Sequence, residues 1–299
     1  MSLFDQLVNQ ALKTQVELSP LRVVVEKELL HHDILREMSE AGLLQNLTFM
    51  GGTCLRACYG SNRLSEDLDF TGGADFNREQ LIDLGDVLTN HLRTKYDLAV
   101  EVSEPSRQEG NVDTWKVKVT TRPEQSDLPM QRINIDICAI PSYEPKPMML
   151  LNHYGIDMGT SGLILQAESQ EEILANKLVA LALRPNRIKN RDLWDITWLR
   201  QQTVELPLPL LVKKIADHNQ TTGDFMALLE KRLAQLKNDD LSRESFVQEM
   251  RRFLPPVIAK RTVESDEFWQ YLCTTVTQQG LRVLSYLTKG NSSGDLFKM

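Results

Sequence analysis

The chain has 299 residues, of which 41% are hydrophobic and 25% are charged. This composition argues against a disordered protein and provides enough apolar side chains for one large or two smaller globular domains. The formal net charge of −7 argues against a protein that coats nucleic acid through its overall field. No segment approaches the length of a membrane span, and the opening MSLFDQLVNQ lacks the basic start and apolar core of a signal peptide. We therefore expect a cytoplasmic protein without a membrane partner.

Cysteine and histidine give no sign of a metal or redox site. The four cysteines are too few for a disulfide framework, and no Cys-x-x-Cys pair or cysteine–histidine cluster has zinc spacing. The five histidines are scattered, and no serine lies in a G-x-S-x-G turn. We predict small, buried cysteines and assign no role to the histidines.

The first 46 residues are predicted to be helical. The segment SPLRVVVEKELLHHDILREMSEAGLL places apolar residues at helical spacing. Ser19 and Pro20 provide a start for this helix, and Gly42 lies near its end.

Residues 47–140 combine strands and helices. The run LTFM predicts a short strand, TCLRACY a helical turn or two that Gly60 closes, and DLDF a second strand. A helix follows in FNREQLIDLGDVLTNHLRTKY. The segments 113–121 (DTWKVKVTT) and 132–140 (RINIDICAI) alternate strictly between apolar and polar residues. They are predicted to be strands and neighbours in one sheet.

From about residue 168 the chain is predicted to be helical to its end. Ser169 and Glu172 form a capping box, Pro185 ends the first of these helices, and Asn190 is predicted to cap the next.

The elements together predict an α+β fold. Strands and helices alternate in the first part of the chain, and an all-helical part follows. We place one domain at residues 1–165, with its N-terminal helices, and a second, helical domain at residues 166–299.

Gly51 and Gly52 lie between a predicted strand and a short helix. Without side chains, they let backbone amides approach a ligand, and a helix N-terminus favours an anion. Their spacing is neither that of a Walker loop nor that of a dinucleotide fingerprint. The pair indicates a phosphate-binding turn, although a tight strand-to-helix turn would require the same residues.

Asp67 and Asp69 occupy alternate positions of the strand DLDF, so they share one face while Leu68 and Phe70 share the other. Two like charges at this spacing repel each other, and the pair attracts a hard cation such as Mg²⁺. A third acid is expected on an adjacent strand, and Asp136 fits because the isoleucines of its strand occupy the opposite face. The alternative is that all three acids form the solvated side of an antiparallel sheet.

A second group of charges lies in the helical part. Lys177 interrupts an apolar helix, where it either extends to water or reaches into a site. Asp192 and Asp195, three residues apart, project to one face of the next helix. Arg187 or Arg191 would pair with them if the group is a structural salt bridge.

The segment FMGGTCLRACYGSNRLSEDLDF, taken with NKLVALALRPNRIKNRDLWDI, resembles the AbiEii type of nucleotidyltransferase toxin, the enzyme of bacterial abortive-infection (type IV) toxin–antitoxin pairs. The strongest parts of the resemblance are Gly-Gly-Thr-x-Leu, Arg63-x-Ser65-x-Asp67-x-Asp69-Phe70, Lys177 and Arg191-Asp192-x-x-Asp195. It implies the nucleotidyltransferase fold of DNA polymerase β relatives, in which a small mixed sheet is flanked by helices. A helical C-terminal portion then closes a cleft over the nucleotide.

The resemblance also implies a reaction and residue roles. In such enzymes a hydroxyl attacks the α-phosphate of a nucleoside triphosphate and pyrophosphate leaves, so catalysis is mostly alignment and neutralisation of charge. Asp67 and Asp69 would bind the metal, Mg²⁺ or Mn²⁺, and Asp192 would position the acceptor or a phosphate-binding Arg191. Asp136, as a third metal-binding and catalytic acid, is inferred from the strand pattern and not from the resemblance. The residues implied in binding the triphosphate are Gly51, Gly52, Thr53, Arg63, Ser65 and Lys177.

The expected acceptor is RNA. Some relatives add nucleotides to the 3′ end of tRNA, and the basic run RPNRIKNR (184–191) suits an RNA backbone better than a small acceptor. The resemblance further implies a cognate antitoxin as a partner and a role in phage defence. Two alternatives stay open, namely transfer to a protein or small-molecule hydroxyl, and a nucleotide-binding module without chemistry.

Overall fold

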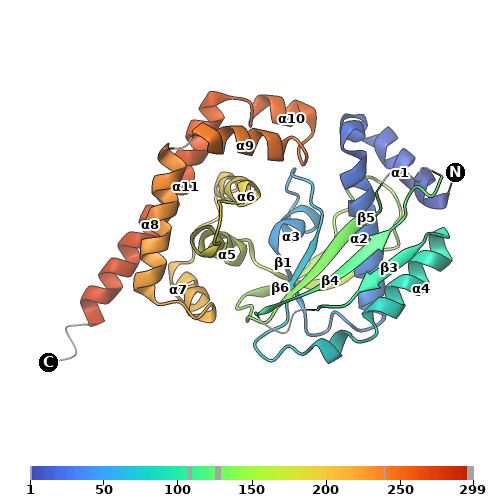
Figure 1. Cartoon of the computed structure of the whole chain (residues 1–299), viewed down its shortest axis with the longest axis horizontal. Helices are drawn as coiled ribbons and strands as arrows, with labels where there is room; N and C mark the ends of the chain where they lie inside the picture. The colour runs from blue at the N-terminus through green and yellow to red at the C-terminus, as the bar shows by residue number, and fades with distance from the viewer. Residues whose placement is uncertain (1, 107–109, 125–128, 239, 295–299) are drawn as a thin grey trace. The chain divides into compact units, whose positions relative to one another are not determined.

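A computed structural model of the chain describes residues 2–106, 110–124, 129–238 and 240–294 (Figure 1). The chain divides into two compact units, Met1–Glu168 and Ser169–Met299. Each unit has its own set of buried apolar side chains.

The first unit is built on a mixed sheet (Figure 1). The order of its strands is β3-β4-β5-β2-β1-β7-β6. β2 is parallel to β5 and β1 is parallel to β7, whereas the other neighbours are antiparallel. The mixed sheet expected from the sequence is therefore confirmed. The strands in the described part of the chain are β1 (Thr48–Met50), β2 (Leu68–Thr71), β3 (Val100–Ser103), β4 (Val112–Val119), β5 (Gln131–Cys138), β6 (Pro145–Met149) and β7 (Ile164–Glu168).

The alternation of apolar and polar residues decides how the central strands lie. Ile133 and Ile135 on β5 and Leu68 on β2 are fully buried. β4 pairs with β5 along its whole length and places Trp115 opposite Ile135. The predicted pairing of these two strands is confirmed. Burial of one face leaves the opposite face of the same strands for polar side chains.

α2 is the central helix of the first unit, and it packs against α1, α4 and β5 (Figure 1). Its predicted start at Ser19 and Pro20 is a few residues too early, because both lie in a 3₁₀ turn that precedes the helix. Its predicted end is confirmed, since Gly42 has a φ of +74° just after the last turn. The helices of this unit are α1 (Leu3–Thr14), α2 (Arg22–Glu40), α3 (Gly51–Ala57) and α4 (Leu84–Tyr96), with 3₁₀ turns η1 (Val16–Leu21) and η2 (Arg78–Leu81).

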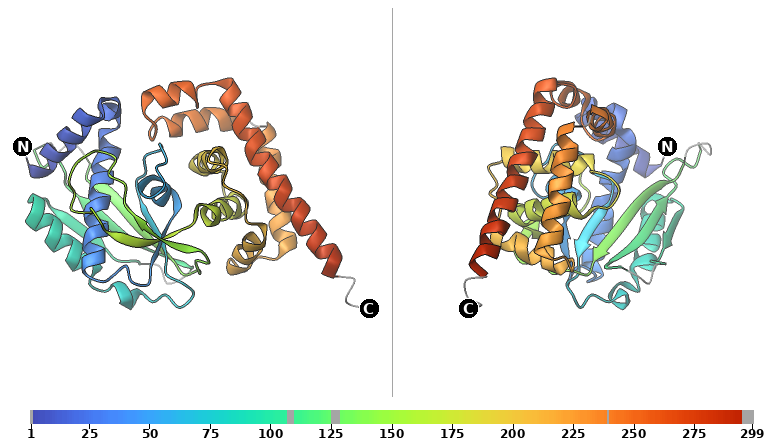
Figure 2. Two further views of the ribbon diagram at one scale, coloured as in Figure 1. Left: turned by 180° about the vertical axis from the view of Figure 1, so that it is seen from behind. Right: turned by 60° about the vertical axis from the view of Figure 1, so that its left-hand side comes forward.

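The described residues of the second unit form helices joined by turns. α8 and α11 run side by side (Figure 2). A fully buried ion pair joins two other helices, with Nζ of Lys214 on α7 2.5 Å from Oε1 of Glu172 on α5. The helices are α5 (Gln170–Leu183), α6 (Asn190–Gln201), α7 (Leu208–Asp217), α8 (Thr222–Asn238), α9 (Asp240–Met250), α10 (Pro256–Arg261) and α11 (Asp266–Gly294).

The two predicted helix caps have different outcomes. Oγ of Ser169 accepts a hydrogen bond from the amide of Glu172 at 3.1 Å, which confirms the cap of α5. Asn190 is the first residue of α6 and does not cap it. Its side-chain amide donates instead to Ser245 and Glu249, both at 3.1 Å. The tertiary partners on α9 therefore replace the local cap.

The cysteines and the most apolar helices were also the subject of expectations from the sequence. Cys54, Cys58 and Cys138 are free and buried as predicted, whereas Cys273 is partly exposed. In the part of the chain that the structure describes, no helix combines the length and the apolar character needed to cross a membrane.

Candidate active site

A tight turn joins β1 to α3 at the first of the two glycines. Gly51 has a φ of +76°, a conformation that residues with a side chain rarely adopt. A Cβ at this position would also lie 2.7 Å from Oδ2 of Asp69. Gly51 is thus required for two separate reasons, the backbone conformation and the close approach of the turn to the Asp69 carboxylate.

Gly52 allows a second close approach. A Cβ here would overlap the guanidinium of Arg63. Arg63 is only 2% exposed, and its Nη1 donates to the carbonyl oxygen of Leu64 at 3.0 Å. The turn therefore has a carboxylate against its first glycine and a cation against its second. Contact of the two glycines with a triphosphate stays a prediction.

The three aspartates predicted to bind metal lie on, or directly before, two adjacent strands. Asp69 on β2 lies opposite Asp136 on β5 in a parallel register, so both side chains emerge on the same face of the sheet. Asp67 immediately precedes β2, and its Oδ1 accepts a hydrogen bond from the amide of Asn134 at 3.1 Å. Oδ1 of Asp136 accepts a hydrogen bond from the hydroxyl of Thr114 at 2.6 Å. All three carboxylates keep partial access to solvent.

The donor chemistry of this face fits a hard divalent cation. Mg²⁺ prefers carboxylate oxygens, and it usually takes one or two of them and completes its coordination with water and substrate phosphates. Among the described residues, no group of three or more His, Cys, Asp and Glu side chains is arranged to hold a metal ion. Binding of Mg²⁺ by the aspartates stays a prediction, in which a bound nucleotide would complete the set of ligands.

Thr53 and Ser65 brace the loop that leads from α3 into β2. Their hydroxyl oxygens are hydrogen-bonded at 2.7 Å, and the hydroxyl of Thr53 also contacts the carbonyl oxygen of Asp67. Thr53 is 2% exposed and Ser65 is 5% exposed. Both residues therefore position the backbone at Asp67. Their contact with a nucleotide stays a prediction.

Glu28 on α2 is the centre of a buried network that sequence reasoning missed. Its carboxylate accepts hydrogen bonds from Nε of Arg56 at 3.2 Å, from the amide of Ser65 at 3.1 Å, and from the hydroxyl of Tyr154. Burial raises the pKa of Glu28, but the charge of Arg56, the Tyr154 hydroxyl and the neighbouring histidines together outweigh burial and keep the pKa below its usual value. The network thereby ties the loop between α3 and β2 to the central helix.

Several polar residues on the buried face of α2 belong to this network. Glu28, His31 and His32 on α2 are all buried, and with His153 they line a cavity of about 20 Å³, which is enough for one water molecule. Burial lowers the pKa of His32 to about 4. Three of the histidines to which the sequence assigned no role, His31, His32 and His153, thus belong to the structural support beneath the loop.

In the second unit, Lys177 on α5 lies between two buried aspartates of α6. Its Nζ is 2.8 Å from Oδ1 of Asp192 and 2.9 Å from Oδ2 of Asp195. Nη2 of Arg184 adds a second cation 3.2 Å from Asp192. Burial would raise the pKa of Asp192, but the charges of Lys177, Lys189 and Arg184 outweigh burial and lower it. Lys177 therefore does not simply extend to water, because two carboxylates fix its ammonium group.

Arg191 has other neighbours than the sequence suggested. Its Nε lies 3.3 Å from Oε1 of Glu249, and its guanidinium lies 4.8 Å from the ring centre of Phe253. The sequence named Arg187 or Arg191 as the partner of the aspartates on α6, and the structure gives this part to Lys177 and Arg184. Residues adjacent in a helix point in different directions, so Arg191 and Asp192 reach different neighbours.

Each unit therefore brings together one group of the predicted site residues. In the second unit, Lys177 and Asp192 are in direct contact, and Asp195 joins them. A joint action of the two groups on one nucleotide stays a prediction. The group in the first unit consists of Gly51, Gly52, Thr53, Arg63, Ser65, Asp67, Asp69 and Asp136.

Comparison with known proteins adds an independent finding. A family model described as nucleotidyl transferase AbiEii toxin, type IV TA system, matches residues 33–272. The match includes every residue of the two groups described above. No curated protein matches the chain.

A comparison with solved structures gives a further finding. MenT4, a nucleotidyltransferase toxin from Mycobacterium tuberculosis, superposes with a TM-score of 0.57 at 16% sequence identity, over 94% of this chain and 89% of MenT4. JHP933 from Helicobacter pylori has a TM-score of 0.42 at 17% identity, over 92% of this chain and 98% of that protein. At this level of identity, the likeness to MenT4 concerns the fold and not the substrate.

Proposed function

The chain belongs to the AbiEii family of nucleotidyltransferase toxins of type IV toxin–antitoxin systems, and on this premise we propose that it transfers a nucleoside monophosphate to RNA. The donor is a nucleoside triphosphate, the acceptor is an RNA end such as the 3′ end of a tRNA, and pyrophosphate is released. Nucleotidyltransferase activity follows from the family. The RNA acceptor, the divalent metal, a cognate antitoxin, a role in phage defence and the cytoplasm as the place of action are parts of the proposal.

The observation that carries the proposal is the position of Asp69. It lies opposite Asp136 on a parallel strand and against Gly51 of the turn. Carboxylates that bind metal and a turn without side chains that admits phosphate are thus adjacent, as nucleotidyl transfer requires. This adjacency supports the proposal that the triphosphate reacts in the first unit.

The chain's own residues have separate proposed roles in this reaction. Asp67, Asp69 and Asp136 would hold Mg²⁺ or Mn²⁺, which when bound supplies positive charge against the phosphate oxygens. Arg63 beside Gly52 supplies a further cation. Lys177, held by Asp192, contacts the β- and γ-phosphates, as the family resemblance implies.

The chemical step needs alignment more than covalent help from the protein. The acceptor oxygen forms a bond to the α-phosphorus, the bond from this phosphorus to the bridging oxygen breaks, and pyrophosphate leaves with the electron pair. The proton of the acceptor hydroxyl is released. The positions of acceptor, phosphorus and leaving oxygen therefore decide the rate.

The remaining predicted residues support this alignment. Gly51 and Gly52 admit the phosphates, Thr53 and Ser65 hold the loop at Asp67 in place, and Arg191 adds positive charge on α6. We further propose that the helical part of the chain, residues 166–299, closes over the nucleotide during the reaction.

Incorporation of label tests the proposal. The purified protein is incubated with Mg²⁺, total tRNA and each α-labelled nucleoside triphosphate in turn, beside Asp69→Asn and the matched variant Asp75→Asn, whose aspartate is exposed on the same unit. We expect label in RNA with the unchanged protein and with Asp75→Asn, and none with Asp69→Asn. Label in protein or in a small molecule would replace the RNA acceptor. Nucleotide binding without any transfer would indicate a binding module.

A further inference from the structure

The two units carry opposite net charge although the whole chain is acidic. Residues 1–168 contain 15 Lys and Arg against 25 Asp and Glu, whereas residues 169–299 contain 19 Lys and Arg against 16 Asp and Glu. A polyanion is repelled by the net negative charge of residues 1–168 and attracted by the net positive charge of residues 169–299. The helical unit is therefore the part of the chain to search for a binding site for nucleic acid.

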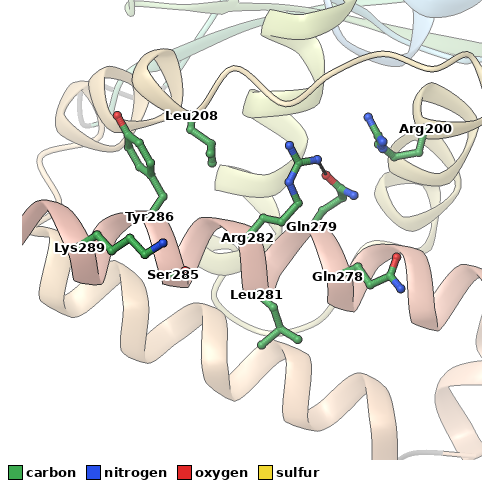
Figure 3. A pocket seen from close by; sticks show the side chains of 9 residues that line it. All are labelled: Arg200, Leu208, Gln278, Gln279, Leu281, Arg282, Ser285, Tyr286 and Lys289. Atoms are coloured by element: carbon green, nitrogen blue, oxygen red, sulfur yellow. Dashed lines mark hydrogen bonds between the residues drawn. The ribbon is translucent and has the colours of Figure 1, made fainter.

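A groove of about 700 Å³ runs along α11 in this unit (Figure 3). Arg200 near the end of α6 and Leu208 at the start of α7 form one of its sides, and residues of α11 form the other. Its described lining contains three cations and no carboxylate. The lining residues of α11 that the argument uses are Gln278, Arg282, Ser285, Tyr286 and Lys289.

The cations of α11 form a regular stripe. Gln278, Arg282, Ser285 and Lys289 follow one another at intervals of four, three and four residues and are all exposed, so they lie on one face of the helix. Arg282 and Lys289 are two turns apart, which is about 10 Å along the axis. Evenly spaced donors along a straight helix suit the repeating phosphates of a nucleic acid strand better than one compact anion.

An exposed carboxylate of the chain itself bridges two cations of the groove. Glu205, whose side chain is 69% exposed, lies 3.2 Å from Nη1 of Arg200 and 3.2 Å from Nη2 of Arg282. The two guanidinium groups thus converge on one pair of carboxylate oxygens. A phosphate has the same charge type and offers oxygens with similar geometry, so it is able to take the place of this exposed carboxylate.

The groove also offers surfaces for bases. The ring of Tyr286 is 38% exposed and lies with Leu208 along the same groove (Figure 3). Bases of a single strand stack on exposed aromatic rings without regard to sequence. Cations for phosphates and an aromatic ring for bases are the two components of a site for single-stranded nucleic acid.

From these observations we propose that the groove along α11 binds the sugar–phosphate backbone of a single-stranded RNA segment. The choice of RNA rests on the proposed function, in which RNA is the acceptor. The groove is a binding surface and not part of the catalytic group. Arg200, Arg282 and Lys289 bind phosphates, Tyr286 stacks on a base, and Glu205 competes with the RNA.

Fluorescence anisotropy with a labelled single-stranded RNA tests the groove without any nucleotide or metal. Arg282→Ala and Lys289→Ala are each expected to weaken binding, with a loss that is about threefold larger at 50 mM than at 200 mM salt, because each reduces the slope of log affinity against log salt by about 0.7. Glu205→Gln is expected to change binding in the opposite direction, because it removes the competing carboxylate. Tyr286→Ala is expected to weaken binding with little change in slope.

A second exposed arginine–glutamate pair of the same unit provides the matched control. Nε of Arg251 lies 3.0 Å from Oε1 of Glu264, and Arg251→Ala and Glu264→Gln are expected to leave the affinity within error. Binding to a labelled duplex of the same length distinguishes single-stranded from duplex recognition, and tighter duplex binding would overturn the proposal. Equal losses for Arg282→Ala and Arg251→Ala would also overturn it, since they would indicate only nonspecific attraction.

The result is separable from that of the labelling experiment. If the groove variants bind RNA normally while label enters RNA, the proposed transfer holds and the groove proposal fails. If the groove variants lose RNA binding but no label enters any RNA, the groove proposal holds and the proposed acceptor fails. Circular dichroism melting checks that the variants, which change exposed side chains, remain folded.

Discussion

The two units hold their aspartates in contrasting ways. In the first unit, Asp67 and Asp136 accept hydrogen bonds from neutral donors, an amide and a hydroxyl, and are partly exposed. In the second unit, Asp192 and Asp195 are buried and lie against the ammonium of Lys177. Carboxylates paired with a buried lysine are balanced inside the protein. The same residue type is thus proposed to bind a metal ion in one unit and fixes a cation in the other.

Replacement of Asp69 is expected to affect activity far more than stability. Asp69→Asn keeps the size of the side chain but removes the charge, and transfer is expected to fall by about 10³-fold, the scale of losing one well-placed electrostatic group. Because the carboxylate is partly exposed, the free energy of unfolding should change by less than about 1 kcal/mol. Labelling rates and urea unfolding measure the two effects. Transfer that stays within tenfold of the unchanged protein would remove Asp69 from the metal-binding set.

Replacement of Asp195 is expected to show the opposite pattern in stability. Asp195→Asn leaves Lys177 with one carboxylate fewer in a buried setting, and the free energy of unfolding is expected to fall by about 3 kcal/mol. The matched control is Glu101→Gln, which breaks the exposed pair of Glu101 and Lys118 at 3.2 Å and should cost less than about 1 kcal/mol. Urea unfolding compares the two variants. If Asp195→Asn unfolds at the same urea concentration as the unchanged protein, the contrast between the units is wrong.

Acid is expected to destabilise the first unit through its buried histidines. Burial lowers the pKa of His32 from 6.5 to about 4, so below pH 6.5 the unfolded chain binds a proton that the folded chain does not. Stability is therefore complete above about pH 6.5 and falls as the pH drops toward 4, by roughly 3 kcal/mol at most for this one group.

His32→Asn isolates this contribution, because asparagine keeps a polar group near Thr160, which lies 3.0 Å from Nδ1 of His32. Urea unfolding at pH 7 and pH 4.5 is expected to give a smaller difference for His32→Asn than for the unchanged protein. The neighbours Glu28, His31 and His153 stay in both proteins, so their effects cancel in the comparison. An equal difference in both proteins would show that His32 is not the responsible group.

Among these four predictions, the smallest effect is expected for Gly51→Ala. The added Cβ would press on the Asp69 carboxylate, and a displacement of that size is expected to lower transfer by about 10²-fold. Gly73→Ala is the control, because Gly73 also has a positive φ, +80°, but a Cβ there meets nothing within 4 Å. Both variants carry the same backbone strain of about 1 to 2 kcal/mol. A similar loss of transfer in both would trace the effect to the backbone and not to Asp69.

Local patterns were sufficient for the central strands and for part of the site. Strict alternation predicted that β4 and β5 are strands and neighbours, since only one register buries their apolar face. The same alternation placed Asp69 and Asp136 on one face of adjacent strands. The strands β3, β6 and β7 were not predicted. β6 carries two prolines and is mostly exposed, so its pattern does not resemble a strand.

The sequence by itself determined that Asp67, Asp69 and Asp136 are strand-associated acids beside a glycine turn, because period and spacing depend on neighbours along the chain. Only the tertiary structure decided that Gly52 accommodates Arg63, that Glu28 holds the loop at Ser65, and that Lys177 pairs with Asp192 and Asp195. It also decided that Asn190 binds α9 and does not cap its own helix. These contacts join segments distant in the chain, and a charged or polar side chain buried on folding takes the partner that packing brings within hydrogen-bond distance. The pattern of residues along the chain does not specify which partner that is.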